Sequence, residues 1–219
     1  MSDLEQELLL QAERLEAIQA CRNLMGKYSY YHTAFRNKDY MKLWIKRDDC
    51  LLVMPFGKFY GYNGVYRCYA ENHGDRSDPD FESYAKGLMM MHQMDTEVIE
   101  VAADGKTAKG CWISPGHETS PAPGKEKGAW SWGKYYVEFM KDEADGKWKF
   151  WKLRLYPLFL MPVDHSWAEP AIEIQGRGKI EGIPMDAPLD EPPYEYAPDR
   201  VYPADEPEPP KAYESYPSV

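Results

Sequence analysis

Two Asp-Gly dipeptides in the second half of the chain most constrain how this sequence can fold. Asp104-Gly105 and Asp145-Gly146 each lie between two long segments in which apolar and polar residues alternate. Such a dipeptide between alternating segments is a strong local signal for a β-hairpin. We therefore expect two hairpins built from long antiparallel strands. The four strands are expected at residues 88–101, 106–115, 128–141 and 147–160, with a long connection at 115–128.

The first third of the chain has mostly helical periodicity instead. Apolar residues recur at spacings of three and four between Leu8 and Met25, which is typical of a helix. Ser2 and Glu5 fit a capping box at its start, and Gly26 suggests a break or a close packing point. Further helices are expected at 27–36, 37–44 and 62–73, around a hairpin at 50–61, and a helical turn at 76–87. Helices followed by a meander of strands indicate an α+β fold, in which a curved, mostly antiparallel sheet wraps around the N-terminal helices.

The composition changes near residue 168. Of the 18 prolines, 12 lie at or after Pro162, and from residue 171 onward 11 acidic residues face only four basic ones. Such a segment forms neither a helix nor a central strand. We therefore divide the chain into a folded domain, 1–167, and an acidic Pro-rich arm, 168–219. Apolar residues at intervals favour an extended arm, docked on its own or a neighbouring subunit, over a solvated disordered tail: Ile183, Met185, Leu189, Tyr194, Tyr196, Val201, Tyr202, Tyr213 and Tyr216.

Composition excludes several classes of function. The net charge of −10, without a basic stripe, argues against a nucleic-acid partner. The four cysteines form no CxxC pair, so neither a zinc site nor a redox motif is expected, and free thiols fit a cytoplasmic protein. The acidic N-terminal segment is unlike a signal peptide, and no apolar stretch of about 18 residues exists to span a membrane. No P-loop, GxGxxG, GxSxG or HExxH motif indicates a nucleotide, a metal or another cofactor.

The stretch "YSYYHTAFR" at 28–36 supplies the first candidate site residues. On a helix, Tyr28 and His32 share the face of the preceding apolar residues, Tyr31 lies beside it and Tyr30 points elsewhere. For a single tyrosine a buried structural role is the more common one, but a histidine one turn away favours a functional site. Histidine titrates near neutral pH and is the most frequent general acid or base.

The other candidates lie on the expected strands. Alternation places Met90, His92, Met94, Thr96 and Val98 on one face, which is the more apolar one, so His92 is expected to point inward. Alternation also places Trp148, Phe150, Lys152, Arg154 and Tyr156 on one face of the last strand, and Lys134 lies between Trp132 and Tyr136 on the strand before it. Structural roles compete with functional ones at each of these positions: a satisfied core histidine, or exposed and ion-paired cations.

The order of these elements, and three segments in particular, resemble the SnoaL-like family of the nuclear transport factor 2-like superfamily. The segments are "LEAIQACRNLMGKYSYYHTAFRNKDYMKLW", "MMHQMDTEVIEVAADGKTAKGCWIS" and "DGKWKFWKLRLYPLFLMPVDHSW". The resemblance covers roughly residues 10–167 and implies a cone-shaped half-barrel with a deep pocket. Family members include scytalone dehydratase, bile-acid 7-alpha dehydratase, ketosteroid isomerase, polyketide cyclases and non-catalytic subunits, and most of the enzymes use no cofactor.

Similarity to bile-acid 7-alpha dehydratase implies residue roles as well. Its tyrosine corresponds to Tyr28 or Tyr31 and its histidine to His92, whereas its helix aspartate corresponds to Thr33 or Arg36, so the carboxylate is missing here. The expected catalytic residues are His92 as base, Tyr28 as hydrogen-bond donor to developing charge and His32 as acid. The expected substrate-binding residues are Tyr31, Trp132, Lys134, Arg154 and Tyr156.

These residues favour a cofactor-independent lyase that acts on a hydroxylated aromatic or polycyclic small molecule. The reaction would be a dehydratase-type elimination or a related carbon–carbon cleavage. The alternatives are an isomerase that moves a proton on a steroid-like or aromatic ketone, a polyketide-type cyclase, and a non-catalytic ligand-binding or subunit role. A homo-oligomer, dimer or trimer, is expected, with the C-terminal arm in contact with a neighbour.

Overall fold

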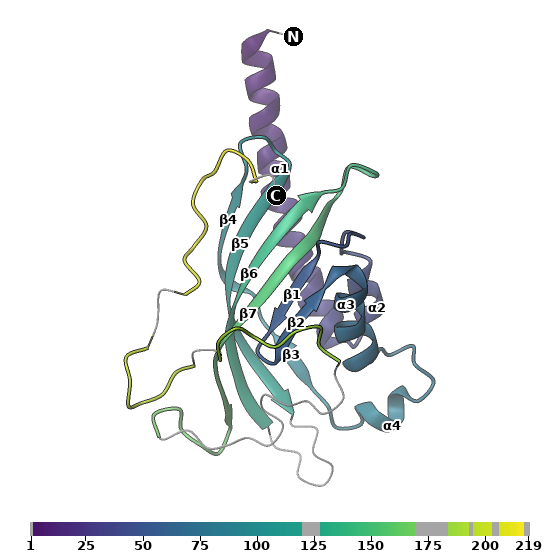
Figure 1. Ribbon diagram of the computed structural model, residues 1–219, viewed down its shortest axis with the longest axis vertical. Helices are drawn as coiled ribbons and strands as arrows, with labels where there is room; N and C mark the ends of the chain where they lie inside the picture. Colours follow the sequence, from purple (N-terminus) through teal and green to yellow (C-terminus); the bar gives the residue numbers. More distant parts are fainter. Residues whose placement is uncertain (1, 120–127, 170–183, 193–194, 203–205, 217–219) are drawn as a thin grey trace.

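The computed structural model describes residues 2–119, 128–169, 184–192, 195–202 and 206–216. Within these ranges a curved, unclosed seven-stranded sheet has helices along one side (Figure 1). The strands are β1 (Leu51–Met54), β2 (Gly57–Tyr60), β3 (Met90–His92), β4 (Asp95–Val101), β5 (Thr107–Thr119), β6 (Gly128–Lys141) and β7 (Trp148–Pro162). The helices are α1 (Asp3–Thr33), α2 (Asn37–Met41), α3 (Gly61–Tyr66), the π-helical η1 (Arg67–Asn72) and α4 (Phe81–Ala85).

The sheet has the strand order β2-β1-β7-β6-β5-β3, and β4 also pairs with β5. All pairs are antiparallel except β1 with β7, which is parallel. Both Asp-Gly turns are present, with Gly105 and Gly146 at φ of 70° and 69°, a region that favours glycine. The predicted α+β class and its mostly antiparallel, curved sheet are therefore confirmed.

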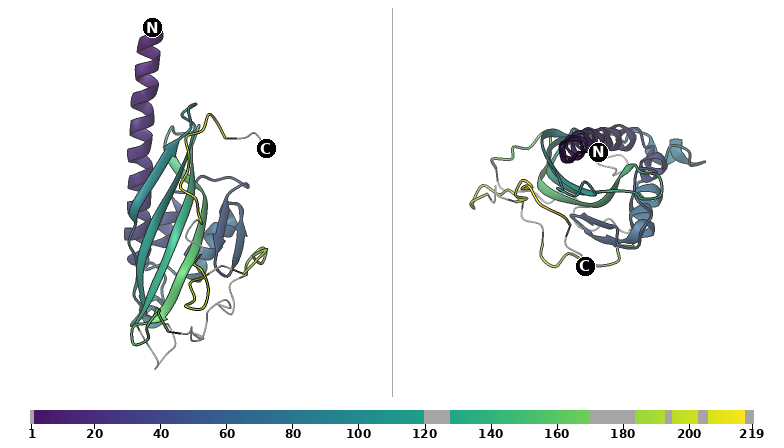
Figure 2. Two further views of the ribbon diagram at one scale, coloured as in Figure 1. Left: turned by 90° about the vertical axis from the view of Figure 1, so that its left-hand side faces the viewer. Right: turned by 90° about the horizontal axis from the view of Figure 1, so that it is seen from above.

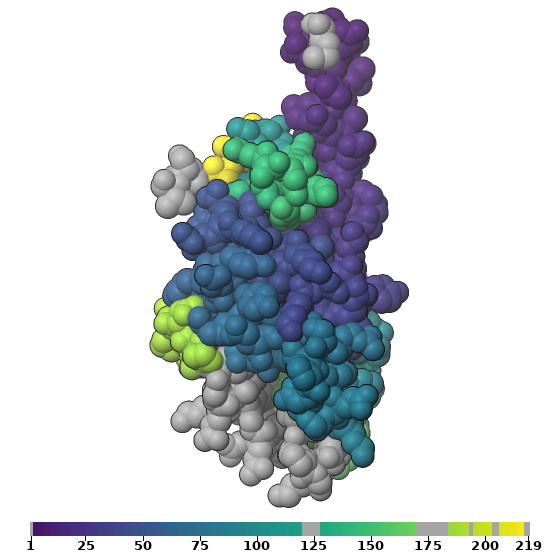
Figure 3. All heavy atoms as spheres, turned by 90° about the vertical axis from the view of Figure 1, so that its right-hand side faces the viewer, coloured from purple at the N-terminus to yellow at the C-terminus, as the bar shows by residue number. Residues whose placement is uncertain are grey.

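A single long helix, α1, lies along the concave side of the sheet, which we call the inner face (Figure 2). The predicted capping box is present: Ser2 Oγ accepts from the Glu5 amide at 3.3 Å, and the Ser2 amide donates to Glu5 Oε2 at 2.7 Å. The predicted break at Gly26 is wrong, because the helix runs through it and a Cβ there would meet nothing within 4 Å. The first turns of α1 project beyond the sheet (Figure 3).

The predicted strand 88–101 is two strands, β3 and β4, and the prediction of one continuous face is wrong. Thr96 has a φ of 51°, and the register against β5 shifts between Asp95 and Val98. A bulge of this kind reverses which side chains face the core. Val98 is consequently exposed, whereas Ile99 packs on the core.

The faces predicted for the side chains of the last strand are wrong because of a second bulge. Glu138 pairs with Lys152 but Phe139 pairs with Phe150, so Trp151 is an extra residue in β7. Phe150 therefore faces the core, where it is fully buried, while Lys152 lies on the opposite, outer face. The single face predicted for these alternate residues does not exist.

The end of β5 differs from prediction too. The connection expected at 115–128 begins later, because β5 continues to Thr119 and pairs with β3 and β6 over this length. Residues 120–127 lie outside the described residues. This extension adds Gly116 and Glu118 to the sheet, and both matter for the site described below.

The described parts of the C-terminal arm lie against the outer face and the β2 edge of the same chain. Ala187 forms an isolated β-bridge with Lys58, and Asp186 accepts from the Tyr60 amide at 2.8 Å. Near the C-terminus the Tyr216 ring packs edge-on against Trp151, with ring centroids 4.7 Å apart. Ile183 and Tyr194 lie outside the described residues. Contact of the arm with a neighbouring subunit, and the domain boundary after residue 167, stay predictions.

Candidate active site

Tyr28 and His32 lie one turn apart on the face of α1 that packs on the sheet. Their side chains are buried and their rings stack, with centroids 5.5 Å apart and planes 13° apart. Tyr30 is 81% exposed on the opposite side of the helix. The helical spacing thus predicted correctly which members of the aromatic stretch face inward.

The Tyr28 hydroxyl belongs to a buried cluster of phenols. It lies 3.1 Å from the hydroxyl of Tyr135 on β6, and it accepts a hydrogen bond from the hydroxyl of Tyr69 on η1 at 3.4 Å. Burial raises the pKa of all three phenols well above the usual value near 10. Each is therefore protonated at neutral pH, and Tyr28 is a hydrogen-bonding group already engaged with two neighbours.

The protonation of His32 follows from its hydrogen bond to Asn37. The Asn37 Nδ2 group donates to the Gly74 carbonyl at 2.7 Å, so its Oδ1 is the atom that faces His32 Nδ1 at 2.9 Å. Because an amide oxygen only accepts, His32 Nδ1 carries the proton and Nε2 has a lone pair. Burial, together with the neighbouring His73 and His92, lowers the pKa of His32 to about 3. At neutral pH His32 is therefore a neutral acceptor, not the acid predicted from the sequence.

His92 on β3 meets a carboxylate that the sequence reasoning missed. Its Nε2 lies 3.3 Å from Oε1 of Glu118 on β5, and the two side chains are 11% and 31% exposed. Antiparallel pairing of Met90 with Glu118 and of His92 with Gly116 makes them diagonal neighbours on the inner face. Burial on its own would raise the pKa of Glu118, but the hydrogen bond and charge of His92 and a hydrogen bond from Ser131 together lower it. Glu118 is therefore held as an anion beside the imidazole.

Gly116 allows the imidazole to occupy this position. A Cβ at Gly116 would lie 2.7 Å from His92 Nδ1 and would collide with the backbone carbonyl of Ser131. Real Cβ atoms essentially never approach so closely, so the ring uses the space that a side chain would fill. The alternation Trp112, Ser114, Gly116, Glu118 was the available sequence signal, but it required the strand to continue beyond Pro115.

A third histidine joins this group. His73, which follows η1, donates from Nδ1 to the Cys68 carbonyl at 2.8 Å, the assignment that a carbonyl partner requires. Its ring centroid lies 5.5 Å from that of His32, which in turn lies 5.8 Å from that of His92. Burial lowers the pKa of His73 as well. We call His73, His32, His92 and Glu118 the inner cluster.

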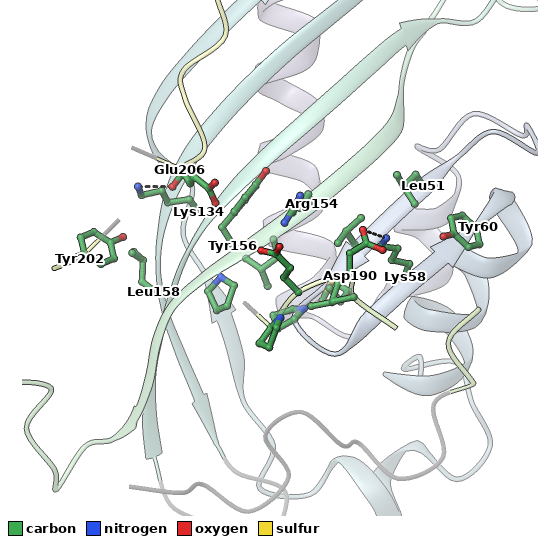
Figure 4. A pocket seen from close by; sticks show the side chains of 18 residues that line it. Leu51, Lys58, Tyr60, Lys134, Arg154, Tyr156, Leu158, Asp190, Tyr202 and Glu206 are labelled. Carbon is green, nitrogen blue, oxygen red and sulfur yellow. Dashed lines mark hydrogen bonds and ion pairs between the residues drawn. The ribbon is translucent and has the colours of Figure 1, made fainter. Parts of the chain in front are cut away.

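The predicted substrate-binding residues do not join the inner cluster. Lys134, Arg154 and Tyr156 lie on the outer face, around a different cavity that the arm borders (Figure 4). Trp132 stacks on Phe159, with centroids 5.9 Å apart. Tyr31 stays beside the inward face of α1, where the Arg36 guanidinium lies 4.8 Å from its ring centroid.

Over the residues that the structure describes, no group of three or more His, Cys, Asp or Glu side chains is arranged to hold a metal ion. No described helix combines the length and apolar character needed to cross a lipid bilayer.

Comparison with known proteins adds a family and a set of similar folds. The model of the SnoaL-like domain matches residues 13–154. A candidate scytalone dehydratase from Novosphingobium aromaticivorans has a similar structure, with 15% identity, a TM-score of 0.54, and coverage of 71% of this chain and 99% of that one. A hexachlorocyclohexane dehydrochlorinase, LinA type 3 from Novosphingobium barchaimii, has 16% identity, a TM-score of 0.54, and coverage of 71% and 96%.

A further structure, of LinA, has 14% identity, a TM-score of 0.56, and coverage of 72% of this chain and 96% of that one. No curated protein matches the chain in sequence. At these identities the structural similarities establish a shared fold.

Proposed function

The chain belongs to the SnoaL-like domain family, and from this premise we propose that it is a cofactor-independent lyase with His92 as its general base. The observation that carries the proposal is the pair of His92 and Glu118 on the inner face, 3.3 Å apart. A carboxylate beside an imidazole fixes the ring's orientation and stabilises the imidazolium that forms when the base takes a proton. Glu118 thus supplies, from a strand, the carboxylate that is missing from the helix.

The two ring nitrogens of His92 have different roles in this proposal. Nε2–H is directed at Glu118, which leaves the basic lone pair on Nδ1. Nδ1 lies close over Gly116, in space that a side chain at that position would fill. The substrate's acidic C–H would be placed at Nδ1, and the imidazolium then returns its proton to the departing hydroxyl, so that water leaves.

The remaining members of the inner cluster supply polarity without charge. His32 presents a lone pair on Nε2 and stays neutral at neutral pH, so it can accept a hydrogen bond from a substrate hydroxyl. His73 likewise carries its proton on Nδ1, which donates to the Cys68 carbonyl, and so has a lone pair on Nε2. Such a site suits a neutral, hydroxylated ring, and we propose a hydroxylated aromatic or polycyclic substrate, dehydrated or cleaved at a carbon–carbon bond.

An isomerase is the second candidate, and Glu118 is the observation that favours it. A carboxylate on the inner wall is the base expected for moving a proton along an aromatic or steroid-like ketone. The lowered pKa of Glu118 argues against this assignment, because it makes the carboxylate a weaker base. A lyase with His92 as base is therefore the better supported function.

The test follows abstraction of the acidic C–H proton, which both candidate reactions require and which deuterium uptake reports when the protonated base exchanges with solvent. The purified full chain would be incubated in D₂O with 3-hydroxy-3,4-dihydronaphthalen-1-one, which is a β-hydroxy ketone. NMR would follow the uptake of deuterium and the loss of water. We expect both for the wild type, neither for His92→Ala, and wild-type rates for His117→Ala, which alters the same region of the sheet at a histidine whose ring packs on Trp130. Exchange without loss of water would support the isomerase. Equal rates in His92→Ala and His117→Ala would refute the role of His92.

A further inference from the structure

A cavity of about 610 Å³ lies on the outer face, between the sheet and the C-terminal arm (Figure 4). Strands β1, β2, β6 and β7 line it from the folded domain, and arm residues 189–192 with Tyr202 and Glu206 line it from the other side. Ligand cavities in proteins are typically about 300–1,000 Å³. This space is therefore large enough for a small organic molecule.

Three cations line the cavity, and two of them are engaged by the arm. Lys58 Nζ lies 2.6 Å from Asp190 Oδ2, and Lys134 Nζ donates to the Glu206 carbonyl at 2.9 Å (Figure 4). These two contacts tie the arm to β2 and to β6. They leave Arg154 as the cation to consider for a ligand.

Arg154 is exposed on β7, and its guanidinium lies over the ring of Tyr156, 4.4 Å from the centroid. Among the described residues Arg154 forms no direct ion pair, although its charge, after that of Lys58, helps to lower the pKa of Asp190 on the arm. A guanidinium stacked on a ring keeps its N–H donors in the plane and available at its edge. This is the geometry in which arginine binds a carboxylate through two parallel hydrogen bonds.

Apart from three acidic residues on the arm, Asp190, Glu191 and Glu206, of which Asp190 pairs with Lys58, the rest of the lining suits a flat apolar body. Tyr60, Tyr156 and Tyr202 contribute rings, and the other apolar lining residues are leucines, prolines, a valine and a methionine: Leu51, Val53, Met54, Pro55, Leu155, Pro157, Leu158, Leu189 and Pro192. Aromatic side chains pack well on planar rings while their hydroxyls stay hydrated. An anionic group at Arg154 and an aromatic ring against these walls would use both features.

We propose that this cavity is a second ligand site, which binds a small aromatic carboxylate with Arg154 as its anchor. The site is separate from the inner cluster, because Lys134, Arg154 and Tyr156 point away from the inner face on which Tyr135 and Leu153 are buried. Both sites can therefore be occupied at once. Since the arm forms one wall, a bound carboxylate links the arm to the sheet.

The test is calorimetric titration of the full chain with 2-naphthoate, with neutral 2-naphthamide as the matched ligand. We expect the wild type to bind naphthoate and to bind the amide at least about tenfold more weakly, since hydrogen bonds to charged groups contribute more than neutral ones. Arg154→Gln should weaken naphthoate binding at least about tenfold. Lys147→Gln, which removes one positive charge at an exposed turn, should leave it unchanged.

His92→Ala separates this proposal from the proposed function. Naphthoate binding unchanged in His92→Ala supports a site away from the inner cluster, whatever the variant does to catalysis. The proposal is overturned if the wild type does not bind naphthoate at millimolar concentration, if the amide binds equally well, or if Arg154→Gln binds like Lys147→Gln. Leu158→Trp, whose indole ring would occupy part of the cavity, should also weaken naphthoate binding and serves if Arg154→Gln does not fold.

Discussion

Replacement of His32 by asparagine should remove part of the dependence of stability on pH. His32 has a pKa of about 3 in the folded chain, lowered first by burial, against 6.5 for an ordinary histidine. Between these two values the unfolded chain binds a proton that the folded chain does not. Stability is therefore fully present above the unfolded pKa and is lost as the pH falls.

The size of this effect follows from the two pKa values. Each pKa unit corresponds to about 1.4 kcal/mol, so acidification from about pH 7 to about pH 5 should cost about 2 kcal/mol through His32 alone. This window lies above the ordinary pKa of 4.5 for a glutamate, so Glu118, whose folded pKa is lower still, contributes little to it. His73, whose pKa is also lowered by burial, acts in the same direction.

Urea denaturation followed by tryptophan fluorescence would measure the change between the two pH values. His32→Asn keeps an N–H donor close to the position of Nδ1, for the bond to Asn37. The variant should be less stable at both pH values because it lacks the ring, but it should lose about 2 kcal/mol less on acidification than the wild type does. His165→Asn, at a histidine outside the inner cluster, should retain the wild-type difference. If the two variants behaved alike, or if NMR showed His32 titrating near its ordinary pKa, this reasoning would be wrong.

Three further substitutions test other parts of the structure. Gly116→Ala should displace both the His92 ring and the strand at Ser131, and should abolish turnover. The NMR signals of His92 would report the displacement of the ring and circular dichroism the state of the fold; unchanged histidine signals would contradict the close approach. Tyr28→Phe leaves two buried hydroxyls without their partner and should lower the free energy of unfolding by about 1–3 kcal/mol, measured in urea; an unchanged value would argue against the phenol cluster. Tyr216→Ala removes the ring that packs on Trp151, so hydrogen exchange of residues 206–216 should accelerate, and protection equal to that of the wild type would show that this contact does not hold the arm.

Much of the architecture followed from short-range signals in the sequence. The Asp-Gly turns, the capping box and the strands β6 and β7 were predicted within a few residues, because each depends on neighbours along the chain. The inward face of α1 followed from helical spacing in the same way. The SnoaL-like resemblance, drawn from these same segments, is confirmed by the family match over residues 13–154.

The bulges were not predictable from alternation alone. The extra residue Trp151 in β7 and the turn of the backbone at Thr96 each reverse the side that later residues face. Periodicity assigns faces by counting residues, so one unpaired residue changes every assignment beyond it. Whether a strand carries such a residue depends on how its partner packs.

The sequence by itself determined the fold class, the hairpins and the identity of one wall of the inner cluster, because these features arise from contacts between residues close in the chain. Only the tertiary structure decided that the four members of the inner cluster, His32, His73, His92 and Glu118, meet on the inner face of the sheet. It also decided that Arg154 lies on the outer face. These residues come from α1, the end of η1, β3, β5 and β7, which are separated by long stretches of sequence. Their meeting depends on sheet register, on bulges and on the missing side chain at Gly116, none of which a local pattern encodes.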